Sequence, residues 1–226
     1  MSNVPSSLFK YKSIAGDGFR HVIDMMENER IFLSTHTMMN DPEEGDILLD
    51  DAFQNGFGAW KASLDDRIKA RSIIDSTRYC SFCLDPDLKL LWSHYANAYK
   101  GIALEYKFAS DVLGSSTIKK IQYSARPYMK RIDFEAMISE QKRPFDLGMF
   151  TYKSPEWAYE KEYRLFHAEH GQMYFKLRPS SVILGKCYAS DAMSNSLIEI
   201  AKACNIKVKY LMDGDCNRFD VFDPLA

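Results

Sequence analysis

Hydrophobic and polar positions alternate in short runs along this chain of 226 residues, and several runs have the two-residue period of a half-buried strand. β-branched and aromatic residues concentrate in these runs, and Gly, Pro, Asn and Asp flank them. We therefore predict strands at residues 8–12, 31–34, 78–84, 102–106, 119–123, 163–168, 182–184 and 207–211. The strands occur throughout the chain, which favours a fold centred on a sheet.

A second set of segments has apolar residues at the spacing of one helix face. We predict helices at residues 18–29, 88–98, 132–141 and 191–204, the last with Asp191 as its N-cap and Asn205 where it stops. Helices and strands are interleaved irregularly, with no fixed repeat and no regular βαβ series. This order predicts an α+β fold.

No Pro-, Gly- or Ser-rich linker divides the chain, so we predict a single domain over residues 1–226. Residues 46–74 mix acidic, apolar and basic positions after a long irregular stretch. We expect this segment to be a helical insertion that packs beside the sheet.

The composition indicates a globular protein, because 46% of the residues are apolar and no run approaches the roughly 18 apolar residues of a membrane span. We expect no membrane partner. The five cysteines, at 80, 83, 187, 204 and 216, are odd in number and scattered, which is typical of reduced thiols. A cytoplasmic location follows from this pattern.

Cys80 and Cys83 have the spacing of half a zinc site, but no second pair follows them. Residues three apart on a strand point to opposite faces, so we expect no metal there. The net charge of −2 argues against a protein that holds nucleic acid by bulk electrostatics. A local basic cluster is formed by Lys119, Lys120, Arg126, Lys130 and Arg131, with Lys142 and Arg143 nearby, and its simplest interpretation is a solvated face.

The first segment that could carry chemistry is the turn Asn40-Asp41-Pro42-Glu43, which follows a predicted strand. Asn40 and Asp41 can hydrogen-bond their own backbone, and Pro42 fixes φ. Such a turn can be purely structural, or it can place polar groups, with the nearby His36, at the edge of a sheet.

The second segment is the aromatic helix Leu91-Trp92-Ser93-His94-Tyr95, with Gly101 as the expected residue beyond its end. Leu91, Trp92 and Tyr95 share one face, which is explained by core packing, although a Trp-Tyr face can also hold a planar ring. His94 points elsewhere. A lone histidine of this kind is either structural or functional.

The third segment is Trp157-Ala158-Tyr159-Glu160-Lys161-Glu162-Tyr163-Arg164. If it is extended, Glu160, Glu162 and Arg164 line one face, so that two carboxylates and a guanidinium converge. Arg164 would then hold one carboxylate as an ion pair, and the other would act as a base or stabilise positive charge. The alternative is a structural salt-bridge network.

These segments together resemble a large bacterial and phage family catalogued as a domain of unknown function, over about residues 8–185. The residues that carry the resemblance are Leu8-Phe9-Lys10-Tyr11-Lys12, the turn Asn40-Asp41-Pro42-x-Glu44, the helix from Leu91 to Gly101, and Trp157-x-Tyr159-Glu160-x-Glu162-Tyr163-Arg164. The family itself implies no reaction.

The pair Glu160-x-Glu162 is also similar to the Glu-x-Glu signature of ADP-ribosyltransferases. That resemblance implies that Glu162 is the catalytic acid, which stabilises the ribosyl oxocarbenium ion when nicotinamide leaves NAD. Those enzymes have a Ser-Thr-Ser-like strand end, to which Ser34-Thr35-His36 is similar. They also have an Arg or His on the first strand, where this chain has Lys10, Tyr11 and Lys12.

The resemblance further implies a split, mostly antiparallel sheet with flanking helices, NAD as the substrate and no metal. The acceptor would be a protein or a nucleic acid, in a toxin or phage-defence setting with an antitoxin or chaperone as a neutralising partner. The catalytic residues would be Glu162, Glu160 and Arg164, and the NAD-binding residues would be Lys10, Tyr11, Ser34, Thr35, His36, Asn40, Asp41, Trp92, His94 and Tyr95.

Two alternatives come from other classes of protein. One is a phosphodiester hydrolase with a divalent metal held by Asp41, Glu43, His94, Glu160 and Glu162, although no closely spaced ligand pair such as H-x-D occurs. The other is a non-catalytic module in which the aromatic helix and the basic cluster bind a nucleotide or a single strand by stacking and phosphate contacts.

Overall fold

The computed structural model describes residues 5–41, 43, 45–46, 62–108, 116–125, 127–167, 171–188, 192–213 and 219–222, and it has the α+β fold that the sequence predicts. Helices and short 3₁₀ turns occupy α1 (Gly18–Glu27), η1 (His36–Met38), α3 (Leu64–Ser76), α4 (Lys89–Tyr95), α5 (Arg131–Ile138), η2 (Pro144–Leu147), η3 (Pro155–Glu160) and α6 (Ala192–Ala203). The strands are β1 (Ser7–Lys12), β2 (Arg30–Phe32), β3 (Tyr79–Cys83), β4 (Ile102–Lys107), β5 (Thr117–Lys120), β6 (Gln122–Tyr123), β7 (Tyr152–Lys153), β8 (Glu162–Phe166), β9 (Tyr174–Lys176), β10 (Ser181–Leu184), β11 (Lys207–Asp213) and β12 (Phe219–Phe222).

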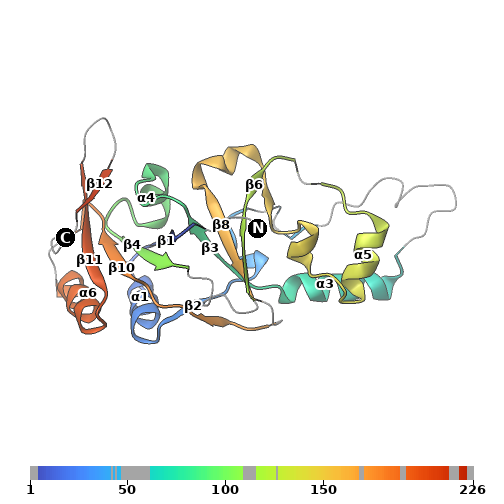
Figure 1. The fold of residues 1–226 in the computed structure, drawn as a ribbon, viewed down its shortest axis with the longest axis horizontal. Helices are drawn as coiled ribbons and strands as arrows, with labels where there is room; N and C mark the ends of the chain where they lie inside the picture. Colours follow the sequence, from blue (N-terminus) through green and yellow to red (C-terminus); the bar gives the residue numbers. More distant parts are fainter. Residues whose placement is uncertain are drawn as a thin grey trace.

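Eight of the strands in these ranges form one sheet, in the order β12-β11-β10-β4-β1-β3-β8-β5 (Figure 1). Neighbouring strands are antiparallel except β10 and β11, which are parallel. Two small sheets join β2 to β9 and β6 to β7. The prediction of a mostly antiparallel sheet is therefore confirmed.

The sheet is split between β1 and β3. β1 pairs with β4 along its whole length, from Ser7 to Lys12, but its register with β3 consists of the single pair Phe9 and Cys83. Next to this pair, Lys10 Nζ donates a hydrogen bond to the carbonyl oxygen of Ser81 at 3.0 Å. The Lys10 side chain thus bonds the Ser81 carbonyl, and backbone pairing between β1 and β3 is limited to one position.

Helices cover both faces of the sheet (Figure 1). On one face, α1, α6 and the β2–β9 pair pack on residues that include Leu8 and Cys80. On the other face, α4 packs on residues that include Tyr11 and Cys83. Cys80 and Cys83 therefore lie on opposite faces, as the strand prediction required. A further cluster joins α3, α5 and η2 to β3 and β8 at one end of the molecule.

Several elements differ from the prediction. The strand predicted over 119–123 divides into β5 and β6. The strands β7, β9 and β12 were not predicted, because they are short or have no clear alternation. The segment that was expected to be extended up to Glu160 is the 3₁₀ turn η3, and only β8 after it is a strand. Pro155 at the start of η3 favours a helical turn.

Helix α4 ends at Tyr95, earlier than predicted, and Gly101 is not its terminating residue. The chain leaves the helix through three successive residues with positive φ, Asn97, Ala98 and Tyr99. Gly101 is required by a close approach, because a Cβ there would lie 2.3 Å from the carbonyl oxygen of Lys12. Its role is to let the backbone pass β1.

The expected insertion at residues 46–74 includes most of α3, which ends two residues later and begins with a capping box between Ser63 and Asp66. Residues 47–61 lie outside the described residues. In the part of the chain that the structure describes, no helix has both the length and the apolar character needed to cross a membrane.

Candidate functional site

A cavity of about 320 Å³ lies where the sheet is split. Residues of β1, β3 and β8 line it together with α4, β7, η3 and the segment after β2. This volume is within the range of small-molecule sites in proteins. The lining residues are Phe9, Lys10, Tyr11, Lys12, Ser34, Met38, Met39, Asn40, Ser81, Phe82, Cys83, Leu91, Tyr95, Lys153, Glu160 and Glu162.

Glu162, the first residue of β8, lies in the cavity wall opposite Cys83 of β3. Arg164 is two residues further along the strand and therefore points to the same face. Its Nε donates to Glu162 Oε1 at 2.6 Å and its Nη2 to Glu162 Oε2 at 3.2 Å. Arg164 is fully buried, and its Nη1 also donates to the carbonyl of Phe150. The predicted pairing of Arg164 with one glutamate is confirmed.

Glu160 reaches the same place by a turn. It is the last residue of η3, and Lys161 after it has φ 47°, in the left-handed region, so the chain reverses sharply before β8. Tyr95 donates its hydroxyl to Glu160 Oε1 at 2.7 Å, and Asn40 Nδ2 donates to that hydroxyl at 2.9 Å. The carboxylates converge as predicted, although an extended chain is not the cause.

Lys153 of β7 joins the two glutamates. Its Nζ lies 2.7 Å from Glu160 Oε2 and 2.8 Å from Glu162 Oε2, and the side chain is 8% exposed. The ammonium also lies 5.1 Å from the centre of the Trp157 ring. Lys153 was not among the predicted site residues. The available signal was a lysine that follows two aromatic residues, in Phe150-Thr151-Tyr152-Lys153, seven positions before Glu160.

We call Glu160, Glu162, Lys153 and Arg164 the paired-carboxylate cluster. Burial opposes ionisation of Glu162, but the charges of Arg164 and Lys153 outweigh it and lower the pKa of Glu162 to about 2. Burial also acts to lower the pKa of Lys153, yet Glu162 and Glu160 raise it above its usual value. Glu162 and Lys153 are therefore both ionised at neutral pH.

Lys10 and Lys12 of β1 also line the cavity. Burial and the charge of Lys10 lower the pKa of Lys12 to about 8. On β3, Ser81 also lines the cavity, and its buried Oγ has no hydrogen-bond partner in the described part of the chain. An unsatisfied buried hydroxyl is unfavourable unless something else bonds it.

The structure brings seven of the predicted site residues, from four separate segments, to the cavity. They are Lys10, Tyr11, Ser34, Asn40, Tyr95, Glu160 and Glu162. Tyr11 has an additional structural role, because its hydroxyl donates to the carbonyl of Asp85 and accepts from the amide of Leu88. It therefore fixes the start of α4.

Three predicted residues, all in the segment after β2, do not line the cavity. Their side chains bond other residues. His36 is buried, and its Nε2 lies 2.7 Å from Asp75 of α3. Asp41 is buried, and its Oδ1 accepts from the amide of Glu43, which closes the expected turn. The hydroxyl of Thr35 bonds that of Thr37. His36 and Asp41 hold this loop in place, and the prediction that the three residues bind NAD gains no geometric support.

Two predicted residues of α4 also lie away from the cavity lining. Trp92 is fully buried, and its Nε1 donates to the carbonyl of Pro86 at 2.7 Å. It also packs against the rings of Tyr11 and Tyr99. His94 is exposed on the helix. The core interpretation of this helix is correct for Trp92, and only Tyr95 carries its polar group to the cavity.

The five residues of the metal-site alternative are not brought together, since only Glu160 and Glu162 among them line the cavity. The described residues contain no group of three or more His, Cys, Asp and Glu side chains suited to a metal ion.

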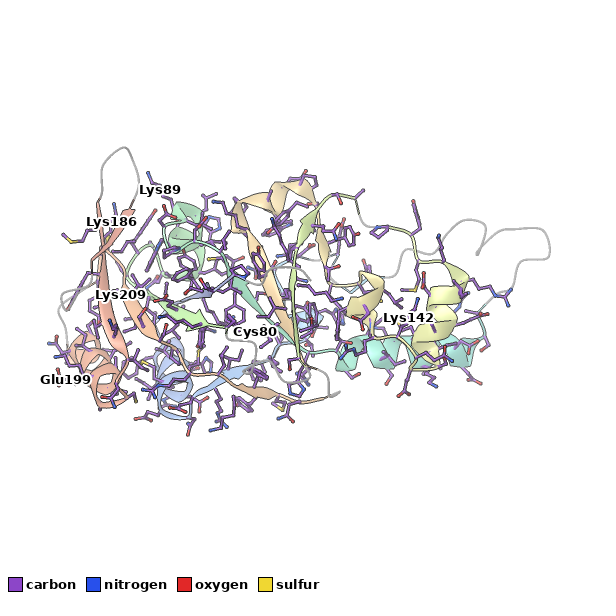
Figure 2. The ribbon with its side chains drawn as sticks, viewed as in Figure 1. Cys80, Lys89, Lys142, Lys186, Glu199 and Lys209 are labelled. Atoms are coloured by element: carbon purple, nitrogen blue, oxygen red, sulfur yellow. The ribbon has the colours of Figure 1, made fainter. Side chains whose placement is uncertain are left out.

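Two residues of the predicted basic cluster, Lys119 and Arg131, pair with neighbouring carboxylates, as do the two basic residues near it, and Arg126 lies outside the described residues. Lys119 and Arg143 pair with Asp146, and Lys142 pairs with Asp133. Lys142 lies at the α3–α5 end of the molecule, well away from Cys80 on β3 (Figure 2). This supports the interpretation of the cluster as a solvated face.

Residues 91–165 match a family model described as "Protein of unknown function (DUF2971)". The matched segment begins inside α4 and ends inside β8, so it includes Tyr95 and all four residues of the paired-carboxylate cluster. The resemblance to a family of unknown function is confirmed for this segment. No curated protein and no solved structure matches the chain.

Proposed function

We propose that this protein transfers ADP-ribose from NAD to an acceptor, with the reaction at the paired-carboxylate cluster. The observation that carries the proposal is the meeting of three adjacent strands around one cavity. β1 contributes Lys10, β3 contributes Ser81 with its unsatisfied hydroxyl, and β8 contributes Glu162. The resemblance to ADP-ribosyltransferases assigned the serine of such a site to Ser34. Ser81, however, lies on β3, between β1 with Lys10 and β8 with Glu162.

The chemistry uses charge that is already present. When the bond between C1 of the ribose and the nicotinamide nitrogen breaks, its electron pair leaves with nicotinamide and positive charge develops on the ribose. A carboxylate held beside C1 stabilises that charge without reorganisation. Glu162 suits this role because its pKa of about 2 keeps it ionised. Glu160 would accept the proton that the acceptor loses as it bonds to C1.

The other polar groups of the cavity fit the remainder of NAD. Lys10 and Lys12 offer positive charge to the phosphates, and Ser81 Oγ offers a hydrogen bond to a ribose hydroxyl or to the nicotinamide amide. The Tyr95 ring and hydroxyl lie at the wall beside Glu160. The cavity is large enough for part of a dinucleotide, so the remainder would extend beyond it.

The acceptor we propose is a protein or a nucleic acid, and the setting is a toxin or phage-defence effector with an antitoxin or chaperone as its partner. The cytoplasm supplies NAD and keeps thiols reduced. In agreement with that location, the described cysteines, which are Cys80, Cys83, Cys187 and Cys204, are all free.

Thermal unfolding of the wild type and of Glu162→Gln, with and without millimolar NAD, tests the proposal when nicotinamide release is measured on the same samples. We expect NAD to stabilise both proteins. Only the wild type should release nicotinamide, with a loss of about 10²- to 10³-fold in the variant. Glu162→Asp keeps the charge that Arg164 needs, and is the matched variant if Glu162→Gln unfolds. Absence of both stabilisation and release in the wild type, with protein and nucleic-acid acceptors supplied, would refute the proposal.

A second candidate is a non-catalytic module that binds a nucleotide. The observation that favours it is that each carboxylate oxygen of Glu160 and Glu162 already has a partner. The partners are Tyr95, Lys153 and Arg164. Carboxylates that are satisfied in this way need no substrate. Stabilisation by NAD without nicotinamide release, in the wild type as well as in Glu162→Gln, would favour this candidate.

A further inference from the structure

Lys153 bridges the two glutamates of the cluster. One ammonium contacts an oxygen of each glutamate, at 2.7 and 2.8 Å, while Arg164 contacts Glu162 alone. Without this lysine, two carboxylates would face each other in a buried place with a single cation beside them. Two carboxylates that share a site raise the pKa of one of them, so that it takes up a proton more readily.

We propose that Lys153 is a positioning residue, which holds Glu160 and Glu162 side by side and, together with Arg164, balances their charge. Its contribution to turnover rests on the function proposed above, whereas its effect on the two carboxylates does not. Lys153 reaches the cluster from β7, whose partner strand β6 is joined to it at the register pair Tyr123 and Lys153. The amide of Ser124 bonds the carbonyl of Lys153 at 3.0 Å, which fixes the backbone from which the side chain extends.

The ammonium is enclosed by groups from several elements. Trp157 of η3 places its ring over the ammonium, and Tyr159 of the same turn lies close enough for Lys153 and Glu160 to act on its pKa. Tyr123 of β6 accepts from the amide of Glu162. The other titratable or charged groups around the cluster are Tyr95 of α4, Cys83 of β3 and Arg164 of β8.

Burial is the main cause that raises the pKa of three of these neighbours, the hydroxyls of Tyr95 and Tyr123 and the thiol of Cys83. They therefore stay uncharged near neutral pH. The charge of the cluster is set by the two glutamates, Lys153 and Arg164. Removal of Lys153 leaves one positive charge for two negative ones.

This charge balance predicts that a second substitution restores part of the thermal stability lost on removal of Lys153. Packing alone predicts no such recovery. Lys153→Met keeps a long apolar side chain but leaves an excess negative charge, and it should lower the midpoint of thermal unfolding by roughly 5–15 °C. Glu160→Gln alone should also be destabilising, because it leaves an excess positive charge. Glu160→Gln added to Lys153→Met restores the balance of Glu162 with Arg164. The double variant should therefore be more stable than Lys153→Met alone.

A matched control is Lys161→Met. Lys161 lies on the same turn between Glu160 and Glu162, but its side chain is 50% exposed and pairs with Asp85 outside the cluster. Its removal should shift the midpoint by no more than ~2 °C, and addition of Glu160→Gln should give no recovery.

The direct experiment is a pH titration of ¹³C-labelled glutamate carboxyls by NMR, in the wild type, Lys153→Met and Lys161→Met, at temperatures where each is folded. In Lys153→Met, we expect the midpoint of one cluster carboxyl to rise by at least about one pH unit, and Lys161→Met should match the wild type. Unchanged midpoints in Lys153→Met, or a double variant less stable than Lys153→Met, would overturn the proposal.

Nicotinamide release, measured as a function of pH, separates this proposal from the proposed function. If the wild type releases nicotinamide, the rate of Lys153→Met should fall below that of the wild type at and below the raised carboxyl midpoint, and it should recover partly as the pH rises above that midpoint and the carboxyl ionises. A wild type that releases none refutes the transferase, and the NMR titration and the double variant still decide the role of Lys153.

Discussion

Glu105 on β4 and Glu162 on β8 are both buried carboxylates of one sheet, and each pairs with a lysine of another strand. Glu105 accepts from Lys209 at 2.9 Å, and from the hydroxyls of Ser7 and Ser181. It has one cation for one charge and does not line the cavity at the split. Glu162 has two cations, a second carboxylate beside it and a place in the cavity wall.

This difference distinguishes a structural ion pair at Glu105 from the surroundings of Glu162, where we propose the reaction. In both places burial opposes ionisation and neighbouring groups outweigh it, so the pKa of Glu105 and that of Glu162 are both lowered. A buried, ion-paired glutamate is thus insufficient evidence of function. The additional evidence at Glu162 is the second carboxylate and the cavity, whose lining residues include Ser81.

The largest contrast is expected when the cation is removed from each place. Arg164→Met should lower the free energy of unfolding by about 3–5 kcal/mol, because two buried carboxylates then share one lysine. Lys209→Met should cost only about 1–2 kcal/mol, because its side chain is 22% exposed and Glu105 keeps two hydroxyl donors. Urea unfolding measures both values. Equal losses would mean that the two carboxylates are the same kind of structural ion pair.

The dependence of stability on pH sharpens the same contrast. The pKa of Glu162 is lowered from 4.5 to about 2 in the folded protein, so its contribution is present above pH 4.5 and is lost as the pH falls towards 2. This contribution amounts to about 3 kcal/mol of the free energy of unfolding. Stability curves of the wild type and Glu162→Gln should therefore converge between pH 4.5 and 2. Parallel curves in this window would contradict the assignment.

The rate of nicotinamide release should depend on Glu160 of the cluster and not on Glu105. Glu160→Gln should slow nicotinamide release by about 10²-fold, since the proposed proton acceptor is removed. Glu105→Gln should leave the rate of the folded protein unchanged. The two variants are matched in chemistry, and comparable losses of rate would show that the effect comes from destabilisation of the sheet.

The smallest effects are expected from two serines. Ser81→Ala removes a hydroxyl with no partner in the described residues, so stability should change by less than about 0.5 kcal/mol while stabilisation by NAD decreases. Ser181→Ala removes a 2.6 Å hydrogen bond to Glu105 and should cost about 1–2 kcal/mol, with NAD stabilisation unchanged. Thermal unfolding with and without NAD measures both. The opposite pattern would place the ligand away from Ser81.

The sequence predicted most of the elements that depend on local pattern. The strands at 8–12, 102–106, 182–184 and 207–211 and the first helix lie close to the observed β1, β4, β10, β11 and α1. Their apolar periodicity is regular, and it specifies which face is buried. The convergence of Glu160 with Glu162 was also predicted, from the alternation of an extended chain, although the turn at Lys161 is what brings the two together.

The remainder of the site depends on contacts between segments far apart in the chain. Lys153 joins the cluster because the short strand β7 pairs with β6, and neither the pairing nor the turn η3 has a strong local signal. Ser81 was missed because it lies in a strand that has ordinary alternation. His36 and Asp41 were assigned to the ligand because a polar residue in a turn has the same local pattern whether it holds the loop or binds a substrate.

A crystal structure of Glu162→Gln soaked with NAD tests the central claim most directly, because the substitution should keep the substrate intact. We expect density for the nicotinamide ribose at the split between β1 and β3, with Ser81 Oγ as a hydrogen-bond partner and the side chain at position 162 beside C1 of the ribose. NAD bound elsewhere on the molecule, or an unchanged cavity at a concentration that saturates thermal stabilisation, would contradict it.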